Sequence, residues 1–164
     1  MSRVIAFSCA HIGTPDTQRY FDRQVTDYKN VKKLLRLIIE TKPDVVVNLG
    51  DWEERLYDPP YYASQILPDY VKVLQDFDVV KIAGNHDKDD GQKAAVIDGI
   101  CYEHGHIGTR ARDIASIRQK FANTKTVHGH SHEPKAGWPL DVGSITFTGT
   151  YGEIINGEPF LRYV

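Results

Sequence analysis

Short apolar runs that each end in a glycine or a polar residue are the feature that most constrains how this chain folds. Residues 4–7, 44–49 and 77–83 are rich in apolar and β-branched side chains, as are strands buried on both faces of a parallel sheet. Between the first two runs, apolar residues recur with the helical period at Val31, Leu34, Leu35, Ile38 and Ile39. This alternation predicts an α/β protein, with helices packed outside one sheet or outside two sheets that lie face to face.

Turn and capping residues indicate the remaining elements. Pro68 suits the first turn of a second helix, and Asp98-Gly99 is typical of a tight hairpin turn. Asp113 is a suitable N-cap for a third helix. The strands expected in the second half of the chain are 95–97, 100–102, 124–127, 144–148, 154–155 and 160–163.

The size and composition of the chain favour one globular domain over residues 1–164. A chain of 164 residues can bury a sizeable core without disulfides as staples. Its two cysteines are too few for a disulfide framework, and no apolar run approaches the ~18 residues of a membrane span. The net charge of −2 gives no overall basic field to attract nucleic acid or an anionic membrane. We therefore expect a cytoplasmic protein without a membrane segment.

The seven histidines lie in four groups, and none is scattered along a helix. The groups are Cys9-Ala10-His11, Gly84-Asn85-His86-Asp87, Glu103-His104-Gly105-His106 and His128-Gly129-His130-Ser131-His132. Asp51 follows Gly50 at the end of the second expected strand. Imidazole is the commonest metal ligand and the usual acid or base near neutral pH. The clustering therefore points to a metal-centred active site.

Each of these groups follows an expected strand, so the loops can converge. Ligands of α/β sheets bind at the carboxyl ends of the strands, and residues two apart in an extended segment can point to the same side. Histidine, carboxylate and amide donors together suit Mn, Fe or Zn. Because the donors outnumber the ligands of one tetrahedral ion, we expect two divalent metal ions that share a bridging aspartate.

In order and spacing, these motifs resemble those of the calcineurin-like metallophosphoesterases, especially their small bacterial, archaeal and phage members. The resemblance extends over residues 5–147 and is carried by Cys9-x-His11, Gly50-Asp51, Gly84-Asn85-His86-Asp87, His104-Gly105, Gly129-His130-Ser131-His132 and Asp141-Val142-Gly143-Ser144. It implies a four-layer α/β/β/α sandwich, with two facing mixed β-sheets flanked by helices. It also implies a metal-dependent phosphoesterase that acts on a phosphodiester or phosphomonoester through a hydroxide activated by two metal ions.

The resemblance also implies a role for each residue. One metal ion would be bound by Cys9, His11, Asp51 and His132, and the other by Asp51, Asn85, His104 and His130, with Asp51 as the bridge. His86 would be the general acid that protonates the leaving group, and Asp87 would orient it. His106 and His128 would be helpers or bystanders. The implied partner is a small phosphorylated substrate, a nucleotide being one candidate, with selectivity expected in the loops at 12–27, 52–62 and 87–94.

Cys9 departs from the family pattern, which has aspartate at this position. Three interpretations stay open: a thiolate that replaces the carboxylate and favours Zn or Fe, a weakened first site that leaves a single metal ion, or a lost first site. The last corresponds to an alternative function, a catalytically silent interaction module, and the retained His86 argues against it. A nuclease of the same superfamily is a further alternative that the absence of an overall basic character disfavours. We expect no disulfide to Cys101, because Cys101 and His104 should face opposite sides of one strand.

Overall fold

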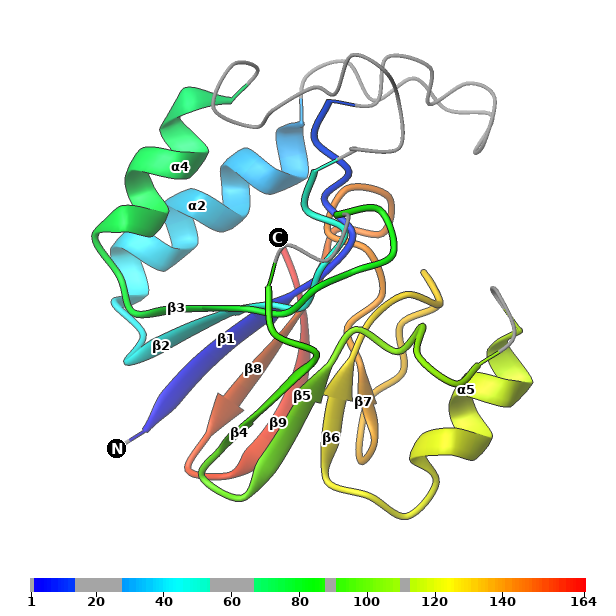
Figure 1. Cartoon of the computed structure of the whole chain (residues 1–164). Helices are drawn as coiled ribbons and strands as arrows, with labels where there is room; N and C mark the ends of the chain where they lie inside the picture. Colours follow the sequence, from blue (N-terminus) through cyan, green and yellow to red (C-terminus); the bar gives the residue numbers. More distant parts are fainter. Residues whose placement is uncertain (1, 14–27, 54–66, 88–90, 110–112) are drawn as a thin grey trace.

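The computed structural model describes residues 2–13, 28–53, 67–87, 91–109 and 113–164, which form two mixed β-sheets and three helices (Figure 1). The expected selectivity loops at 12–27, 52–62 and 87–94 lie wholly or partly outside these residues. The first sheet has the strand order β3-β2-β1-β8-β9. Its strands are β1 (Arg3–Phe7), β2 (Val45–Asn48), β3 (Val79–Lys81), β8 (Thr150–Ile155) and β9 (Glu158–Tyr163).

Both sheets are mixed in strand direction. In the first sheet, β1, β2 and β3 are parallel, while β8 is antiparallel to β1 and β9 is antiparallel to β8. The second sheet has the order β4-β5-β6-β7, in which only the β4–β5 hairpin is antiparallel. Its strands are β4 (Ala94–Ile97), β5 (Ile100–Glu103), β6 (Thr126–His128) and β7 (Leu140–Asp141).

Alternate residues of β1 face two different cores, which places this strand in an inner layer. Ile5 and Phe7 pack in the core that contains the apolar faces of α2 (Lys29–Thr41) and α4 (Pro68–Gln75). Val4 and Ala6 pack in a second core, which also contains apolar residues of the second sheet: Tyr102, Val127 and Leu140. The helix α5 (Ile114–Phe121) lies against the second sheet, and its Phe121 ring stacks on His128 of β6 (Figure 1). The predicted four-layer sandwich is confirmed.

Local signals in the sequence place several elements correctly. Pro68 is at the start of α4, and the Asp113 side chain caps α5 by accepting hydrogen bonds from the N–H groups of Ala115 and Ser116. The hairpin turns at residue pairs 98–99 and 156–157 have left-handed backbone at both positions, as type I′ turns require. No helix in the described residues is long and apolar enough to cross a membrane.

The predicted strand at 144–148 is wrong, because most of this segment is a turn. The backbone of this segment is held by a local turn and by hydroxyl groups, and it is not paired with a neighbouring strand. The N–H of Thr148 donates to the carbonyl of Ser144, and the Thr148 hydroxyl donates to the same carbonyl. Serine and threonine hydroxyls that bind nearby backbone compete with strand pairing, and Ser144 and Thr146 are buried here.

Candidate metal centre

Loops that follow separate strands are hydrogen-bonded to one another at the carboxyl ends of the sheets. The N–H groups of Cys9 and His11 donate to the carbonyls of Gly50 and Asp51, at 3.0 and 2.8 Å. In the second sheet, the N–H of residue 129 donates to the His104 carbonyl at 3.2 Å. The loops after β1, β2, β5 and β6 are therefore joined in pairs, and each pair carries predicted ligands.

Five of the predicted metal ligands have left-handed backbone. Their φ angles are 55° at Cys9, 45° at His11, 54° at Asp51, 68° at His130 and 58° at His132. The expectation that each i, i+2 pair lies on an extended segment is therefore wrong. A non-glycine residue in this conformation costs about 1–2 kcal/mol, and such strain concentrates at functional sites.

Glycines next to these ligands permit backbone contacts that no other residue allows. A Cβ atom at Gly50, whose φ is 98°, would lie 2.6 Å from the backbone nitrogen of Gly84 and 2.9 Å from Nδ1 of His104. A Cβ atom at Gly84 would overlap the Asp51 carboxylate. The Gly-Asp and Gly-Asn pairs of the sequence therefore reflect close packing of two loops beneath the centre.

The Asp87 carboxylate connects the loop that carries Asp51 to the loop that begins at Gly84. One carboxylate oxygen accepts hydrogen bonds from the N–H groups of Asp51 and Gly84, at 2.6 and 3.0 Å. The other accepts from the N–H groups of Trp52 and Glu53, at 3.1 and 3.2 Å. These four bonds are to the backbone, so Asp87 holds the Asp51 loop in place, and its orientation of His86 stays a prediction.

The first group of donor atoms comes from Cys9, His11 and His132, whose ligand atoms all lie within 4.8 Å of one another. The Nε2 atoms of His11 and His132 are 3.4 Å apart. Two nitrogen ligands of one tetrahedral zinc ion, each at about 2.0–2.1 Å from it, are separated by about 3.3–3.4 Å. The two imidazoles are thus spaced as ligands of a common ion.

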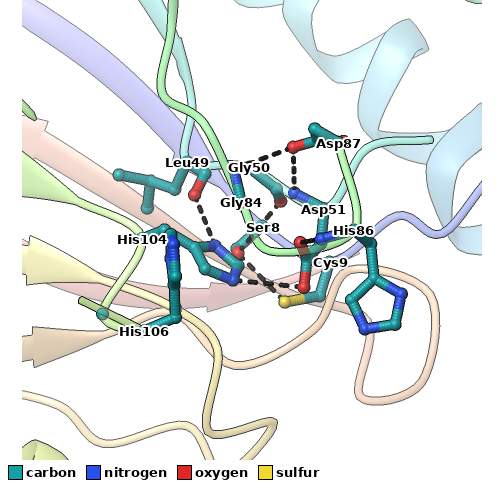
Figure 2. Close-up of polar contacts among 12 residues, drawn as sticks. Ser8, Cys9, Leu49, Gly50, Asp51, Gly84, His86, Asp87, His104 and His106 are labelled. Carbon is teal, nitrogen blue, oxygen red and sulfur yellow. Dashed lines mark hydrogen bonds and ion pairs between the residues drawn. The ribbon is translucent and has the colours of Figure 1, made fainter. Parts of the chain in front are cut away.

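The second group is formed by Cys9, Asp51 and His104 (Figure 2). Nδ1 of His104 lies 2.7 Å from the carbonyl oxygen of Leu49. A carbonyl only accepts, so Nδ1 carries a proton and Nε2 is the ring atom that faces Asp51. Nε2 is buried and lies 3.1 Å from Oδ2 of Asp51, with which it forms an ion pair. This is the arrangement of a histidine ligand fixed by a backbone carbonyl.

The charges of the centre also favour a cation. Burial raises the pKa of the Cys9 thiol well above its usual value, and the Asp51 carboxylate adds to this effect. Burial acts in the same direction on Asp51, but His104, His11 and His86 together outweigh it and lower the pKa of that carboxyl below its ordinary range. The carboxylate is therefore ionised, and a cysteine thiol loses its proton when it binds a metal ion. These donors fit a thiophilic divalent metal ion.

Of the remaining predicted residues, His86 forms a third group with His11 and Asp51, whose ligand atoms also lie within 4.8 Å of one another. His86 is half-buried, its N–H donates to Oδ1 of Asp51 at 2.9 Å, and its ring is edge-on to that of His11 at 4.8 Å between centroids. His130 is buried with its ring 5.0 Å from that of His104. Asn85 is exposed in the same turn as His86, and its amide stays a predicted ligand.

The two histidines predicted as helpers or bystanders differ in their surroundings. His128 is buried, stacks on Phe121 at 4.5 Å and has its pKa lowered to about 4 by burial, which suits a structural residue. His106 is half-buried, and its ring lies 5.1 Å from that of His104.

Sequence reasoning missed the support that the turn at 144–148 gives to the first ligand loop. The hydroxyls of Ser144 and Thr146 donate to the carbonyls of Cys9 and Ala10, at 2.8 and 2.6 Å. The N–H of Ile145 donates to the Ser8 carbonyl at 3.0 Å. The three bonds hold the backbone from which Cys9 and His11 project.

Comparisons with known proteins agree with this architecture. A family model described as calcineurin-like phosphoesterase matches residues 2–153. A predicted phosphoesterase from Streptococcus pneumoniae has a similar structure, with 18% identity, a TM-score of 0.54 and coverage of 98% of this chain and 97% of that one. An archaeal phosphodiesterase has 13% identity and a TM-score of 0.56, with coverage of 99% of this chain and 99% of that one. The phosphoesterase Yfce from E. coli has 16% identity and a TM-score of 0.58, with coverage of 94% of this chain and 88% of that one. A sequence comparison with curated proteins finds no match.

Proposed function

The chain belongs to the calcineurin-like phosphoesterase family, and we propose that it hydrolyses a phosphomonoester or phosphodiester with the help of two divalent metal ions. One observation above all supports this proposal. Thiol, imidazole and carboxylate donors from separate loops meet in groups whose ligand atoms lie within 4.8 Å of one another. A family likeness implies divalent metals, and this donor set is one that could bind them.

We assign the donors to two metal positions. Cys9, His11, Asp51 and His132 form the first, and Asp51, Asn85, His104 and His130 form the second. Metal ions in such a pair activate a water molecule for attack on phosphorus and offset the negative charge of the phosphoryl oxygens. Leu49 contributes through its carbonyl, which fixes the His104 ring, and Asp87 contributes by holding the backbone of the Asp51 loop.

His86 is the general acid of this proposal. Its backbone is fixed by the bond from its N–H to Asp51, whereas its ring is only half-buried. The imidazole is therefore held beside the donors at a place that a substrate can reach. From there it can give a proton to the leaving oxygen, a contribution of typically 10²–10⁴-fold to the rate.

The substrate in this proposal is a small phosphorylated molecule, with a nucleotide as one candidate. The archaeal neighbour is named as a phosphodiesterase and the E. coli neighbour as a phosphoesterase, so both ester classes belong in the test. The protein loaded with Mn, Zn or Fe is assayed on an aryl phosphodiester and an aryl phosphomonoester, before and after chelation. We expect turnover of at least one substrate, lost on chelation and restored by metal.

Two substitutions connect this activity to the site. His86→Ala and Asp51→Asn should each lower the rate about 10²-fold or more. Glu133→Gln is the matched control, because Glu133 follows His132 in the chain but its side chain is 58% exposed. Activity that survives both site changes would refute the assignment. Metal binding well below one equivalent, with no turnover of either substrate, would instead favour the silent interaction module.

A further inference from the structure

Cys9 contributes one sulfur atom to both the first and the second group of donors. Its Sγ lies within 4.8 Å of the ligand atoms of His11 and His132, and also within 4.8 Å of those of Asp51 and His104. A cysteine offers a single donor atom. Both groups therefore meet at the same sulfur, whereas a carboxylate could serve them with different oxygens.

The dimensions allow this sulfur to bind two ions at once. Zinc–sulfur bonds are about 2.3 Å long, so two of them reach across at most ~4.6 Å. Metal ions in two-metal phosphoesterase sites are about 3.5–4 Å apart, which is within that reach. A thiolate has more than one lone pair, so one sulfur can bridge.

Hydrogen-bonding groups fix the position of Sγ. The Cys9 side chain is fully buried, and Sγ lies 3.1 Å from the Ser8 hydroxyl and accepts a bond from the N–H of His130. The Ser8 hydroxyl also has the Gly50 carbonyl within reach, at 3.4 Å. The buried Nε2 of His104 belongs to the same group of donors as the sulfur and lies 3.1 Å from Oδ2 of Asp51.

We propose that Cys9 Sγ is a second bridge, beside Asp51, between the two metal positions, and that it makes the site select zinc, iron or cobalt over manganese. The inference rests on the two metal positions of the proposed function. It differs from a simple replacement of the family's aspartate, in which the sulfur would serve the first position alone. Soft thiolate ligands discriminate against manganese, which prefers oxygen ligands.

Cobalt titration of the metal-stripped full chain tests the bridge. The titration uses the Cys101→Ser protein, because Cys101, on β5, is the other cysteine. Thiolate-to-cobalt charge transfer gives a near-ultraviolet absorption that reports sulfur–metal bonding without reference to turnover. We expect this absorption to rise through both the first and the second equivalent of Co²⁺. A rise that stops at one equivalent, or no such absorption, would overturn the bridge.

The Cys9→Asp and Cys9→Ser variants, in the same Cys101→Ser background, are the matched controls and should lack the absorption. Their thermal unfolding without metal shows whether the two variants fold. If they do not fold, the cobalt titration of the protein that keeps Cys9 still tests the bridge. In competition between Zn²⁺ and Mn²⁺, Cys9→Asp should move the affinity ratio toward Mn²⁺ by about tenfold or more, since oxygen donors suit Mn²⁺. An unchanged ratio would refute the selectivity. Because neither measurement uses turnover, either can fail while phosphate-ester hydrolysis persists.

Discussion

Replacing Asp87 by asparagine tests whether this carboxylate acts on the backbone of the Asp51 loop. The amide keeps one acceptor oxygen, so two of the four N–H groups that now bind Asp87 would face an NH₂ group instead. Each buried donor left without an acceptor costs about 1–3 kcal/mol. We therefore expect the free energy of unfolding to fall by about 2–6 kcal/mol, together with a loss of metal affinity.

Urea unfolding followed by circular dichroism, and zinc binding followed by calorimetry, measure the two effects. The matched control is Asp113→Asn, because the Asp113 carboxylate also accepts backbone N–H groups, those of Ala115 and Ser116. Asparagine caps a helix about as well as aspartate, so this variant should unfold with nearly the wild-type free energy.

The opposite outcome for Asp87→Asn is equally informative. Wild-type unfolding and zinc affinity combined with a reduced kcat would show that Asp87 acts through His86, as the family resemblance implies, and not through the backbone. The position of its four hydrogen bonds leads us to expect the first result.

Three further changes address the glycine contact, the supporting turn and a remote cap. Gly84→Ala should lower zinc affinity by at least tenfold and stability by about 1–3 kcal/mol, because the new Cβ would overlap the Asp51 carboxylate; calorimetry and urea unfolding measure both. Thr146→Val removes the hydroxyl that donates to Ala10 and should reduce stability by about 1 kcal/mol and weaken zinc binding. Asp113→Ala should cost about 1 kcal/mol and leave zinc affinity and turnover unchanged.

Each of these predictions has an outcome that contradicts it. Wild-type zinc affinity in Gly84→Ala would mean that the two loops can separate without harm to the centre. For comparison, Gly108→Ala adds a Cβ in open space at a φ of 72°, so it measures backbone strain without overlap, whereas Gly84 has no left-handed φ and Gly84→Ala adds overlap alone. Unaltered zinc binding in Thr146→Val would remove the turn from the support of the site, and lost turnover in Asp113→Ala would connect α5 to catalysis.

Local chemistry determined most of the fold. β-Branched runs form β1 and β2, the apolar period forms α2, and the cap at Asp113 begins α5. Each of these signals lies within a few residues and depends on backbone preference or on one buried face. The sequence resemblance extended this to two facing sheets, which the structure confirms.

Where local hydrogen bonds compete with bonds to distant parts of the chain, the sequence did not predict the partner. The segment 144–148 has the composition of a strand, but its hydroxyl groups bind the first ligand loop, more than 130 residues away in the chain. Likewise, Asp87 is adjacent to His86 in sequence, yet its carboxylate binds the backbone some 35 residues earlier. A side chain's choice of partner depends on which groups the packed core brings near it, and sequence adjacency does not give that.

The sequence by itself determined which side chains could bind a metal ion. It also showed that these side chains follow the carboxyl ends of predicted strands. Only the tertiary structure decided how they meet: with left-handed backbone at five of the predicted ligands, with glycines in contact beneath Asp51, and with Cys9 Sγ in reach of both donor groups. The physical reason is that ligand type is a property of each residue. The distance between donor atoms on separate loops is instead set by the packing of the whole sandwich.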